Sequence, residues 1–459
     1  MNDTTIKELA FATGGEIISG NENAVFSNIV IDSRQADKDS LFVPLVGEKN
    51  DAHKFLESVY DMGCRAAISS KKDIFLKDDF NIVLVNDTTE ALQKLGKYIR
   101  NKLTLPLVGI TGSVGKTTTR EMVALALSDL KVFKTPNNFN SQVGVPITLS
   151  RINDEEIGVI ELGMSQFGEM ERIAKIVNCD CALVTNIGTA HIENLHTREN
   201  IRAEKFHIMD GMKKGSVVFL NADNDMLFDP PKEKGIVYKY FSAKGNTSCD
   251  YYATDIVFNN AMPEFTAHIG GKKVRVHLNV FGEHQISNAL AAIAVADHYN
   301  LSIESAAKHL EEFRGFSHRQ ELIKLKDFTI IDDTYNASPD SMKASISILK
   351  DFDAERKIAI LADMKELGTD EKILHKEIGD FINENVKLDA VFTVGELAKE
   401  IIKDINKDIY TKSFEDNESL EKFMSGYLKA GDVCLLKGSN SMRLFDVVDK
   451  IKNHEKFIR

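Results

Sequence analysis

The sequence between residues 109 and 119 reads GITGSVGKTTT, and it joins the apolar run 105–108 to a helical pattern. A glycine-rich turn in this position brings backbone N–H groups, the positive end of the following helix and a lysine ammonium together around an anion. Lys116 supplies that ammonium, and Thr117 offers a hydroxyl group to Mg²⁺. We therefore predict a nucleoside triphosphate site whose phosphates contact Gly112, Ser113, Val114, Gly115, Lys116, Thr117 and Thr118.

The spacing of this loop is a tighter variant of the usual phosphate-binding pattern. G-x-x-x-x-G-K-[ST] would place glycine at position 110, where this chain has Ile110. The remaining pattern is G-x-x-G-K-T, in which Gly112 and Gly115 let the backbone approach an anion closely. The alternative is a plain strand-to-helix turn with an exposed lysine, but the flanking strand and helix patterns favour phosphate binding.

Composition limits the class of protein. The chain has 459 residues, which is too long for one ordinary core and predicts about three domains. Its 43% hydrophobic and 27% charged residues are typical of a globular protein. No window approaches the ~18 apolar residues of a membrane helix, so we expect no membrane partner. A net charge of -12 without a cluster of lysines or arginines argues against a nucleic-acid partner.

The N-terminal segment and the cysteines indicate a location. The segment has neither the basic start nor the apolar core of a secretory signal. The five cysteines include no C-x-x-C pair, which fits a reducing compartment and argues against a zinc site. We therefore expect a cytoplasmic protein, and we expect it to be a monomer.

Hydrophobic periodicity divides the chain into three expected units. Residues 1–101 read as a small α/β unit. Residues 102–314 alternate β-rich runs with helical patterns, which predicts a mostly parallel sheet wrapped by helices, with an antiparallel addition at 251–280. Residues 315–459 repeat this alternation and predict a second doubly wound, Rossmann-like domain. The sequence thus predicts a three-domain α/β fold.

Three candidate metal ligands follow the phosphate-binding strand or end the next predicted strands. Thr117 lies in the loop itself, Glu161 ends the run IGVIEL, and His191 follows CALVTNIG. Ligands of open α/β sheets gather at the carboxyl ends of such strands. Taken singly, Glu161 is better explained as a cap or a solvated loop residue, and His191 as a neutral histidine whose hydrogen bonds are satisfied. Their shared position relative to the loop favours a functional interpretation.

Further motifs follow one another along the chain, namely TGSVGKTTT, VIELGMS, VTNIGTAHIE, FGEHQISNALAA, IIDDTYNASPDSM, LADMKELG and LLKGSNSM. In these segments and their order the chain resembles a known family, the Mur ligases, which are ATP-dependent amide ligases of peptidoglycan assembly. The similarity runs from near the N-terminus to beyond residue 440.

Two of these motifs look most like one branch of the family. IIDDTYNASPDSM and LADMKELG resemble the branch that joins D-alanyl-D-alanine to UDP-N-acetylmuramoyl-tripeptide, so the resemblance implies these two substrates. The branch that adds the third peptide residue usually carries D-N-P-R in its last domain, and this chain has no such string. Asn440 stands where arginine is common, so we assign no residues to the dipeptide site.

The resemblance also implies a mechanism. The γ-phosphoryl group of ATP would move to the tripeptide carboxylate, and the dipeptide amine would attack the resulting acyl phosphate. Lys116 would stabilise the transferring group, Thr117 and Glu161 would hold one Mg²⁺, and His191 would help to hold a second. Lys205, in IRAEKFHIM, matches the lysine that these ligases carry as a carbamate, which presents a carboxylate to the metal. From the sequence alone, Lys205 reads as a solvated helix lysine.

The remaining site residues are also implied by the resemblance. On the ATP side it implies His284, Asn288, Arg319, Asp332, Tyr335 and Asn336, with ATP bound between the central and last domains. On the substrate side it implies Ser33 and Arg34 for the uridine diphosphate, and Asn138 and Asn140 for the growing peptide. A structural role is the alternative for each. For Asp332 that role is a turn cap, and function is favoured over it, whereas the segment with Ser33 and Arg34 would on its own read as a surface turn.

Rival functions remain open at this point. Two keep the ligase chemistry, namely the Mur ligase that adds the third residue and a folylpolyglutamate synthetase. The segment IDSR at 31–34 argues against the folate enzyme. A third rival is a scaffold that binds ATP without catalysis, and the combination of lysine, acid and histidine argues against it.

Overall fold

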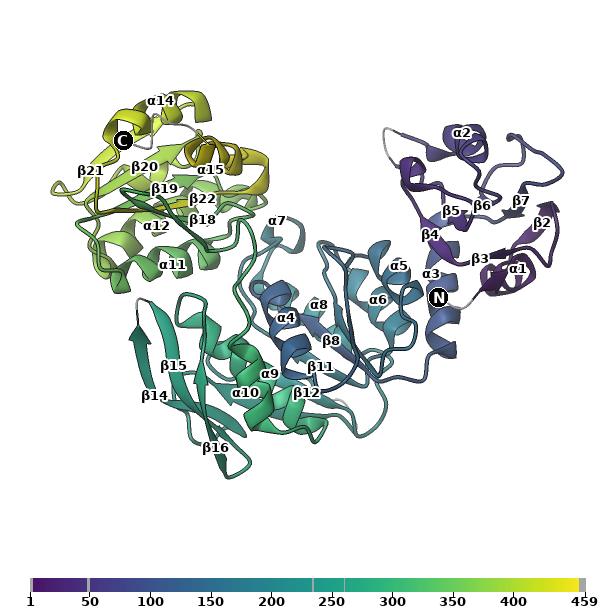
Figure 1. Ribbon diagram of the computed structural model, residues 1–459, viewed down its shortest axis with the longest axis horizontal. Coiled ribbons are helices and arrows are strands. Elements are labelled where there is room, and N and C mark those ends of the chain that lie inside the picture. The colour runs from purple at the N-terminus through teal and green to yellow at the C-terminus, as the bar shows by residue number, and fades with distance from the viewer. Residues whose placement is uncertain (1–2, 48–49, 233–234, 260, 454–459) are drawn as a thin grey trace.

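The computed structural model describes residues 3–47, 50–232, 235–259 and 261–453. Within them the chain forms three masses in sequence order, with the N-terminal mass at the right of Figure 1, the central mass below and the C-terminal mass at the upper left. Each mass is built on a sheet with helices on its faces. This confirms the predicted fold class, a three-domain α/β protein.

The N-terminal mass contains a sheet of strand order β2-β7-β6-β5-β4, parallel except for β2. Its last helix, α3 (Thr88–Lys102), packs against the central mass. There Arg100 is buried and donates from Nε to the carbonyl of Val177 at 2.6 Å. The other elements are α1 (Ile6–Thr13), β2 (Glu16–Ser19), β4 (Asn28–Val30), β5 (Ser40–Phe42), α2 (Leu56–Asp61), β6 (Ala66–Ser69), β7 (Asn81–Leu84) and the two strands of a small second sheet, β1 (Thr4–Thr5) and β3 (Val25–Phe26).

The central mass contains a sheet of strand order β16-β15-β14-β13-β12-β11-β8-β10-β9. It is parallel from β9 to β14, and β14, β15 and β16 pair antiparallel, as predicted for this segment. The strands are β8 (Leu107–Thr111), β9 (Val132–Lys134), β10 (Ile157–Glu161), β11 (Cys181–Val184), β12 (Val217–Asn221), β13 (Val237–Ser242), β14 (Tyr251–Asn259), β15 (Met262–Ile269) and β16 (Lys272–His277).

Helices cover both faces of the central sheet because alternate residues of its strands point to opposite sides. Val108 of β8 packs with one group of helices and Leu107 with the other. The first group is α4 (Lys116–Ala126), α9 (His284–His298) and α10 (Ile303–Leu310), and the second is α5 (Gly144–Ser150), α6 (Glu169–Val177) and α8 (Arg198–Phe206).

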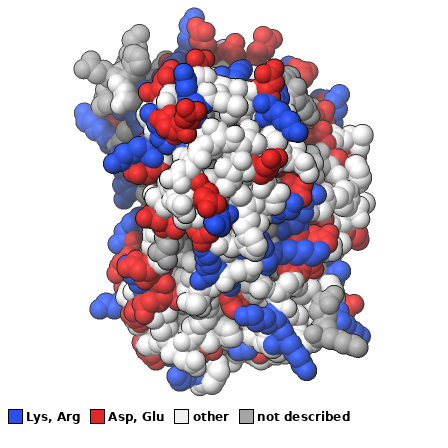
Figure 2. Space-filling view, turned by 90° about the vertical axis from the view of Figure 1, so that its right-hand side faces the viewer, with Lys and Arg blue, Asp and Glu red and all other residues white. Residues whose placement is uncertain are grey.

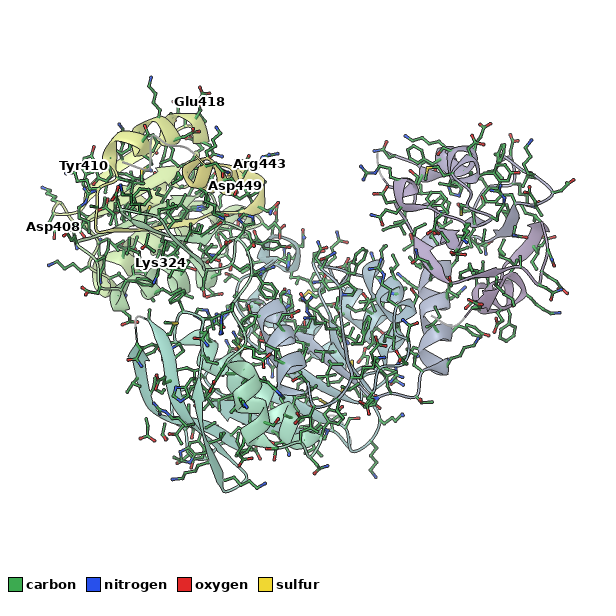
Figure 3. The ribbon with its side chains drawn as sticks, in the orientation of Figure 1. Lys324, Asp408, Tyr410, Glu418, Arg443 and Asp449 are labelled. Atoms are coloured by element: carbon green, nitrogen blue, oxygen red, sulfur yellow. The ribbon has the colours of Figure 1, made fainter. Side chains whose placement is uncertain are left out.

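The C-terminal mass contains a sheet of strand order β17-β18-β22-β19-β20-β21, parallel except for β17. Edge strand β21 begins at Tyr410, which lies with Asp408 on the outer left side in Figure 3. The elements are β17 (Glu321–Lys324), β18 (Thr329–Asp333), α11 (Pro339–Ile348), β19 (Arg356–Ala362), α12 (Glu371–Asn385), β20 (Ala390–Val394), β21 (Tyr410–Phe414), α14 (Asn417–Tyr427), β22 (Asp432–Lys437) and α15 (Leu444–Asn453).

Two features were expected from the composition, namely mixed surface charge and helices that do not span a membrane. On the face shown in Figure 2, acidic and basic side chains are interspersed. Every helix in the described parts of the chain is too short or too polar to cross a membrane.

Candidate functional site

The phosphate-binding loop lies where the sequence predicts it, between β8 and α4. Gly115 has a left-handed backbone (φ 86°) and begins the helix, and Gly112 has φ 153°. A Cβ on Gly112 would lie 1.9 Å from Thr185 Oγ1, so only glycine fits at this position. Lys116 Nζ donates to the carbonyl of Gly112 at 2.7 Å. Burial lowers the pKa of Lys116.

Two residues after β11 fix the conformation of this loop, and the sequence did not single them out. Asn186 accepts the Val114 N–H at its Oδ1 (2.9 Å) and donates from Nδ2 to the Val114 carbonyl (3.0 Å). Thr185 Oγ1 donates to the same carbonyl at 2.7 Å. Both residues belong to the run CALVTNI, which forms β11 and pairs with β8, the strand that leads into the loop. This position next to the loop is the feature of the sequence that could have identified them.

Glu161 ends β10, which pairs with β8, and 2% of the residue's surface is exposed. Its Oε1 accepts from the Thr117 hydroxyl (3.3 Å) and from Asn140 Nδ2 (2.8 Å). Its Oε2 accepts from Arg120 Nη1 at 3.2 Å. A hydroxyl and a carboxylate this close together are oxygen donors of the kind Mg²⁺ prefers, so the residues present fit that ion.

His191 contacts a residue of the C-terminal mass. It precedes the short helix α7 (Ile192–Leu195), and its Nδ1 lies 2.7 Å from Glu366 Oε2. The Glu193 N–H also donates to the Glu366 carbonyl at 3.4 Å. His191 holds the pKa of the Glu366 carboxyl below its usual range. This contact leaves the other ring nitrogen of His191 as its available ligand atom.

Lys205 is buried near the end of α8, with 1% of its surface exposed. Burial, with a smaller contribution from the charge of Lys116, lowers its pKa well below the usual range, whereas Glu204 opposes the shift. Glu204 is itself engaged, because its Oε1 accepts the Met170 N–H at 2.9 Å. Burial therefore disfavours the charged ammonium at Lys205, which is not the solvated lysine that the sequence alone would suggest.

The residues implied for the ATP side come from two masses. At the start of α9, Asn288 accepts from Thr119 Oγ1 at 3.0 Å. His284 begins the same helix, and its burial lowers its pKa. From the C-terminal side, the Arg319 guanidinium lies 3.7 Å from the centre of the Tyr335 ring, a cation–π contact.

The adjacent carboxylates of Asp332 and Asp333 have different hydrogen-bond partners. The Asp332 carboxylate accepts from Thr334 Oγ1 (2.6 Å) and lies 2.8 Å from His318 Nδ1. Asp333 instead accepts from Lys437 Nζ at 2.6 Å, and Lys437 also donates to the Asn336 carbonyl. Asp333 is a cavity-lining residue, whereas Asp332 is not among the described residues that line the cavity.

One large cavity of about 2380 Å³ brings most of these residues together between the central and C-terminal masses. In the described chain, the predicted residues absent from its lining are Gly112, Lys205, Asp332, Ser33 and Arg34. The Arg34 side chain is 86% exposed and pairs with Asp32. The predicted residues that line the cavity are Ser113, Val114, Gly115, Lys116, Thr117, Thr118, Asn138, Asn140, Glu161, His191, His284, Asn288, Arg319, Tyr335 and Asn336.

Comparison with known proteins gives the family of the chain. Residues 110–296 match the profile of the Mur ligase middle domain, and residues 318–440 match that of the Mur ligase glutamate ligase domain. The UDP-N-acetylmuramoyl-tripeptide--D-alanyl-D-alanine ligase of Bacillus subtilis is 34% identical over 97% of both chains. The Haemophilus influenzae protein of the same name is 33% identical over 95% of both.

Solved structures give the same result. MurF from Acinetobacter baumannii superposes with a TM-score of 0.90 and 29% identity, over 99% of this chain and 100% of that one. MurF ligase from Thermotoga maritima, in complex with ADP, has a TM-score of 0.81 and 29% identity, over 92% and 96% of the two chains. Folylpolyglutamate synthase from Mycobacterium tuberculosis, at 15% identity over 80% and 95% and a TM-score of 0.63, shares the fold alone. With both domain profiles and full-length relatives in agreement, the chain belongs to the Mur ligase family.

Proposed function

We propose that this protein is an ATP-dependent amide ligase that joins D-alanyl-D-alanine to UDP-N-acetylmuramoyl-tripeptide. The observation that carries the proposal is the cavity between the central and C-terminal masses, which combines the phosphate-binding loop with Glu161, His191 and Arg319. Full-length similarity to ligases named for these two substrates supports their assignment to this chain.

The reaction needs activation because a carboxylate does not acylate an amine at neutral pH. In the proposed first step, a carboxylate oxygen of the tripeptide attacks the γ-phosphorus of ATP, and the bond to ADP breaks. In the second step, the dipeptide amine attacks the acyl carbon and loses a proton. Inorganic phosphate leaves with the former carboxylate oxygen. Lys116 and Arg319 would stabilise the negative charge on the transferring group.

We further propose that Thr117 and Glu161 hold one Mg²⁺, and that His191 helps to hold a second. A bound Mg²⁺ would neutralise phosphate charge at this site. Lys205 would carry the carbamate, since a neutral buried amine is the form that adds CO₂ and releases a proton. His284, Asn288, Tyr335 and Asn336 would bind the adenosine part of ATP, and Asp333 is a better placed acid than Asp332 for that side of the cavity.

The division of labour among the three units is also part of the proposal. Residues 1–101 would bind the UDP end through Ser33 and Arg34, residues 102–314 would bind ATP, and residues 315–459 would complete the site. Asn138 and Asn140 would contact the peptide. The five cysteines all lie in the described chain and are free, which supports a cytoplasmic location.

Phosphate release gives the most economical test of this function. With ATP, Mg²⁺ and UDP-N-acetylmuramoyl-tripeptide, we expect sustained phosphate release only after D-alanyl-D-alanine is added, together with a UDP-linked pentapeptide detected by mass spectrometry. UDP-linked dipeptide with a diamino acid tests the third-residue ligase, and a folate with glutamate tests the folate enzyme. Turnover with either pair and none with the tripeptide would contradict the proposal.

A second prediction concerns the contact between His191 and Glu366. Glu366→Gln keeps the size of the side chain but removes the charge that orients His191, and losing such a partner of a metal ligand weakens metal binding or activity by about 10–100-fold. We expect kcat to fall about tenfold or more while KM for ATP changes little. Glu396→Gln, which removes an exposed acid paired with Lys399, is the matched control. An unchanged kcat in Glu366→Gln would show that the contact has no role in the reaction.

A further inference from the structure

Arg120 is a buried cation that the reaction as proposed does not use. It lies on α4 three residues after Thr117, and 4% of its surface is exposed. Its Nη2 donates to Glu121 Oε1 at 2.7 Å, and its Nη1 donates to Glu161 Oε2 at 3.2 Å and to the Asn137 carbonyl at 2.9 Å. One guanidinium therefore connects the phosphate-binding helix, the end of β10 and the loop 136–141.

A purely structural ion pair accounts for only part of this arrangement. Two buried carboxylates need a cation between them, and Arg120 supplies it. Glu121, however, has a second cation, because the half-exposed Lys134 also forms an ion pair with its carboxylate. Glu161 has only Arg120 as an ion-pair partner among the described residues. The contact with Asn137 is to a backbone carbonyl and neutralises no charge.

The two oxygens of Glu161 are held by different groups. Oε1 faces the Thr117 hydroxyl and the Asn140 amide, whereas Oε2 accepts from Arg120. By binding Oε2, Arg120 therefore fixes the orientation of the Glu161 carboxylate so that Oε1 faces Thr117. Asn140, the second contact of Oε1, belongs to the same loop whose Asn137 carbonyl Arg120 holds. The loop and the carboxylate cannot move independently while these bonds persist.

We propose that Arg120 is a positioning residue that couples the substrate loop 136–141 to the metal-binding carboxylate of Glu161. Because Arg120 holds the loop and the Glu161 carboxylate in fixed relative positions, each ligand, Mg-nucleotide or UDP-linked peptide, binds more tightly when the other is already bound. This positive coupling is reciprocal between the two ligands. This inference rests on the proposed function, because it takes the Mg²⁺ and peptide sites from it.

The test uses the full chain and calorimetry, so it does not depend on turnover. The Mg²⁺ dependence of ADP binding is measured first, and then the affinity for UDP-N-acetylmuramoyl-tripeptide with and without Mg-ADP. For Arg120→Gln we expect the Mg²⁺ concentration at half-maximal ADP binding to rise about tenfold. ADP binding without Mg²⁺ should change less than about twofold, and the tightening of peptide binding by Mg-ADP should disappear. Arg120→Lys, which keeps the charge, should recover part of both effects.

Two further variants separate a loss of coupling from a loss of folding. Arg120→Gln leaves two buried acids without their shared cation and can fail to fold, so Arg120→Gln/Glu121→Gln, which removes one acid with the cation, then carries the test. Lys131→Gln, which removes a cation from an exposed pair with Asp154, is the control and should behave as the wild type.

The possible outcomes are distinct. A folded Arg120 variant with an unchanged or lower Mg²⁺ requirement, or with intact coupling, overturns the inference. Wild-type protein that binds neither ADP nor the UDP-linked peptide overturns the proposed function as well.

Discussion

Replacing Lys205 with alanine is expected to remove nearly all ligase activity, at least about a hundredfold in kcat, and a short carboxylic acid such as formate should restore part of it. The wild-type side chain is buried, and its pKa is held well below the usual range by burial and by Lys116. A neutral amine reacts with CO₂ to give a carbamate and a proton, so the site gains a carboxylate. The added acid would supply that carboxylate to the cavity left by alanine.

The sign of the pH effect follows from the same chemistry. Lowering the pH favours the protonated amine and releases CO₂, so in CO₂-depleted buffer activity should be lost first on the acid side and return when bicarbonate is added. Lys205→Met is the matched control, because it keeps most of the buried volume and, unlike alanine, leaves no room for the added acid. Full activity in either variant, or an alanine variant that no carboxylic acid rescues, would remove the carbamate from the mechanism.

Replacing Lys116 with methionine is expected to lower kcat/KM for ATP about a thousandfold, or roughly 4 kcal/mol of transition-state stabilisation. Methionine is close in length to the lysine stem but offers no charge to the phosphates. Steady-state phosphate release and calorimetric titration with ADP are the measurements. Folding should be preserved, because Lys116 contacts the loop through the Gly112 carbonyl, which a ligand or water can otherwise satisfy.

The control for this substitution removes a lysine elsewhere. Lys175→Met breaks an exposed pair with Glu171 on α6 and should leave both measurements within about twofold of the wild type. If Lys116→Met retained a kcat/KM within tenfold of the wild type, the phosphate-binding role of the loop would be wrong.

The sequence predicted the buried parallel strands well, because continuous apolar runs flanked by helical patterns have few other interpretations. The strand ending at Glu161 and the loop beginning at Gly112 are examples. Edge strand β21 was missed because its sequence, YTKSF, is partly exposed and mixed in polarity. Helix α5 (GVPITLS) was missed because glycine, proline and β-branched residues are poor helix formers, yet burial against α3 holds it.

The sequence singled out residues at the centre of the candidate site but not the residues that hold them in place. Lys116 and Thr117 are readable because their neighbours in sequence determine their positions. Glu366 meets His191 across 175 residues and Arg120 meets Glu161 across 41, so only the packing of distant elements reveals these contacts. Asp332 and Asp333 show the same limit, since sequence spacing alone does not tell which of two adjacent acids faces the cavity.

The transfer of an oxygen label tests the central claim most directly. UDP-N-acetylmuramoyl-tripeptide carrying ¹⁸O at both oxygens of its terminal carboxylate is incubated with ATP, Mg²⁺ and D-alanyl-D-alanine, and the inorganic phosphate released is analysed by mass spectrometry. If the carboxylate attacks the γ-phosphorus, each phosphate released during ligation carries one ¹⁸O from the peptide. Ligation that yields phosphate without the label would contradict an acyl phosphate and the account of the site built on it.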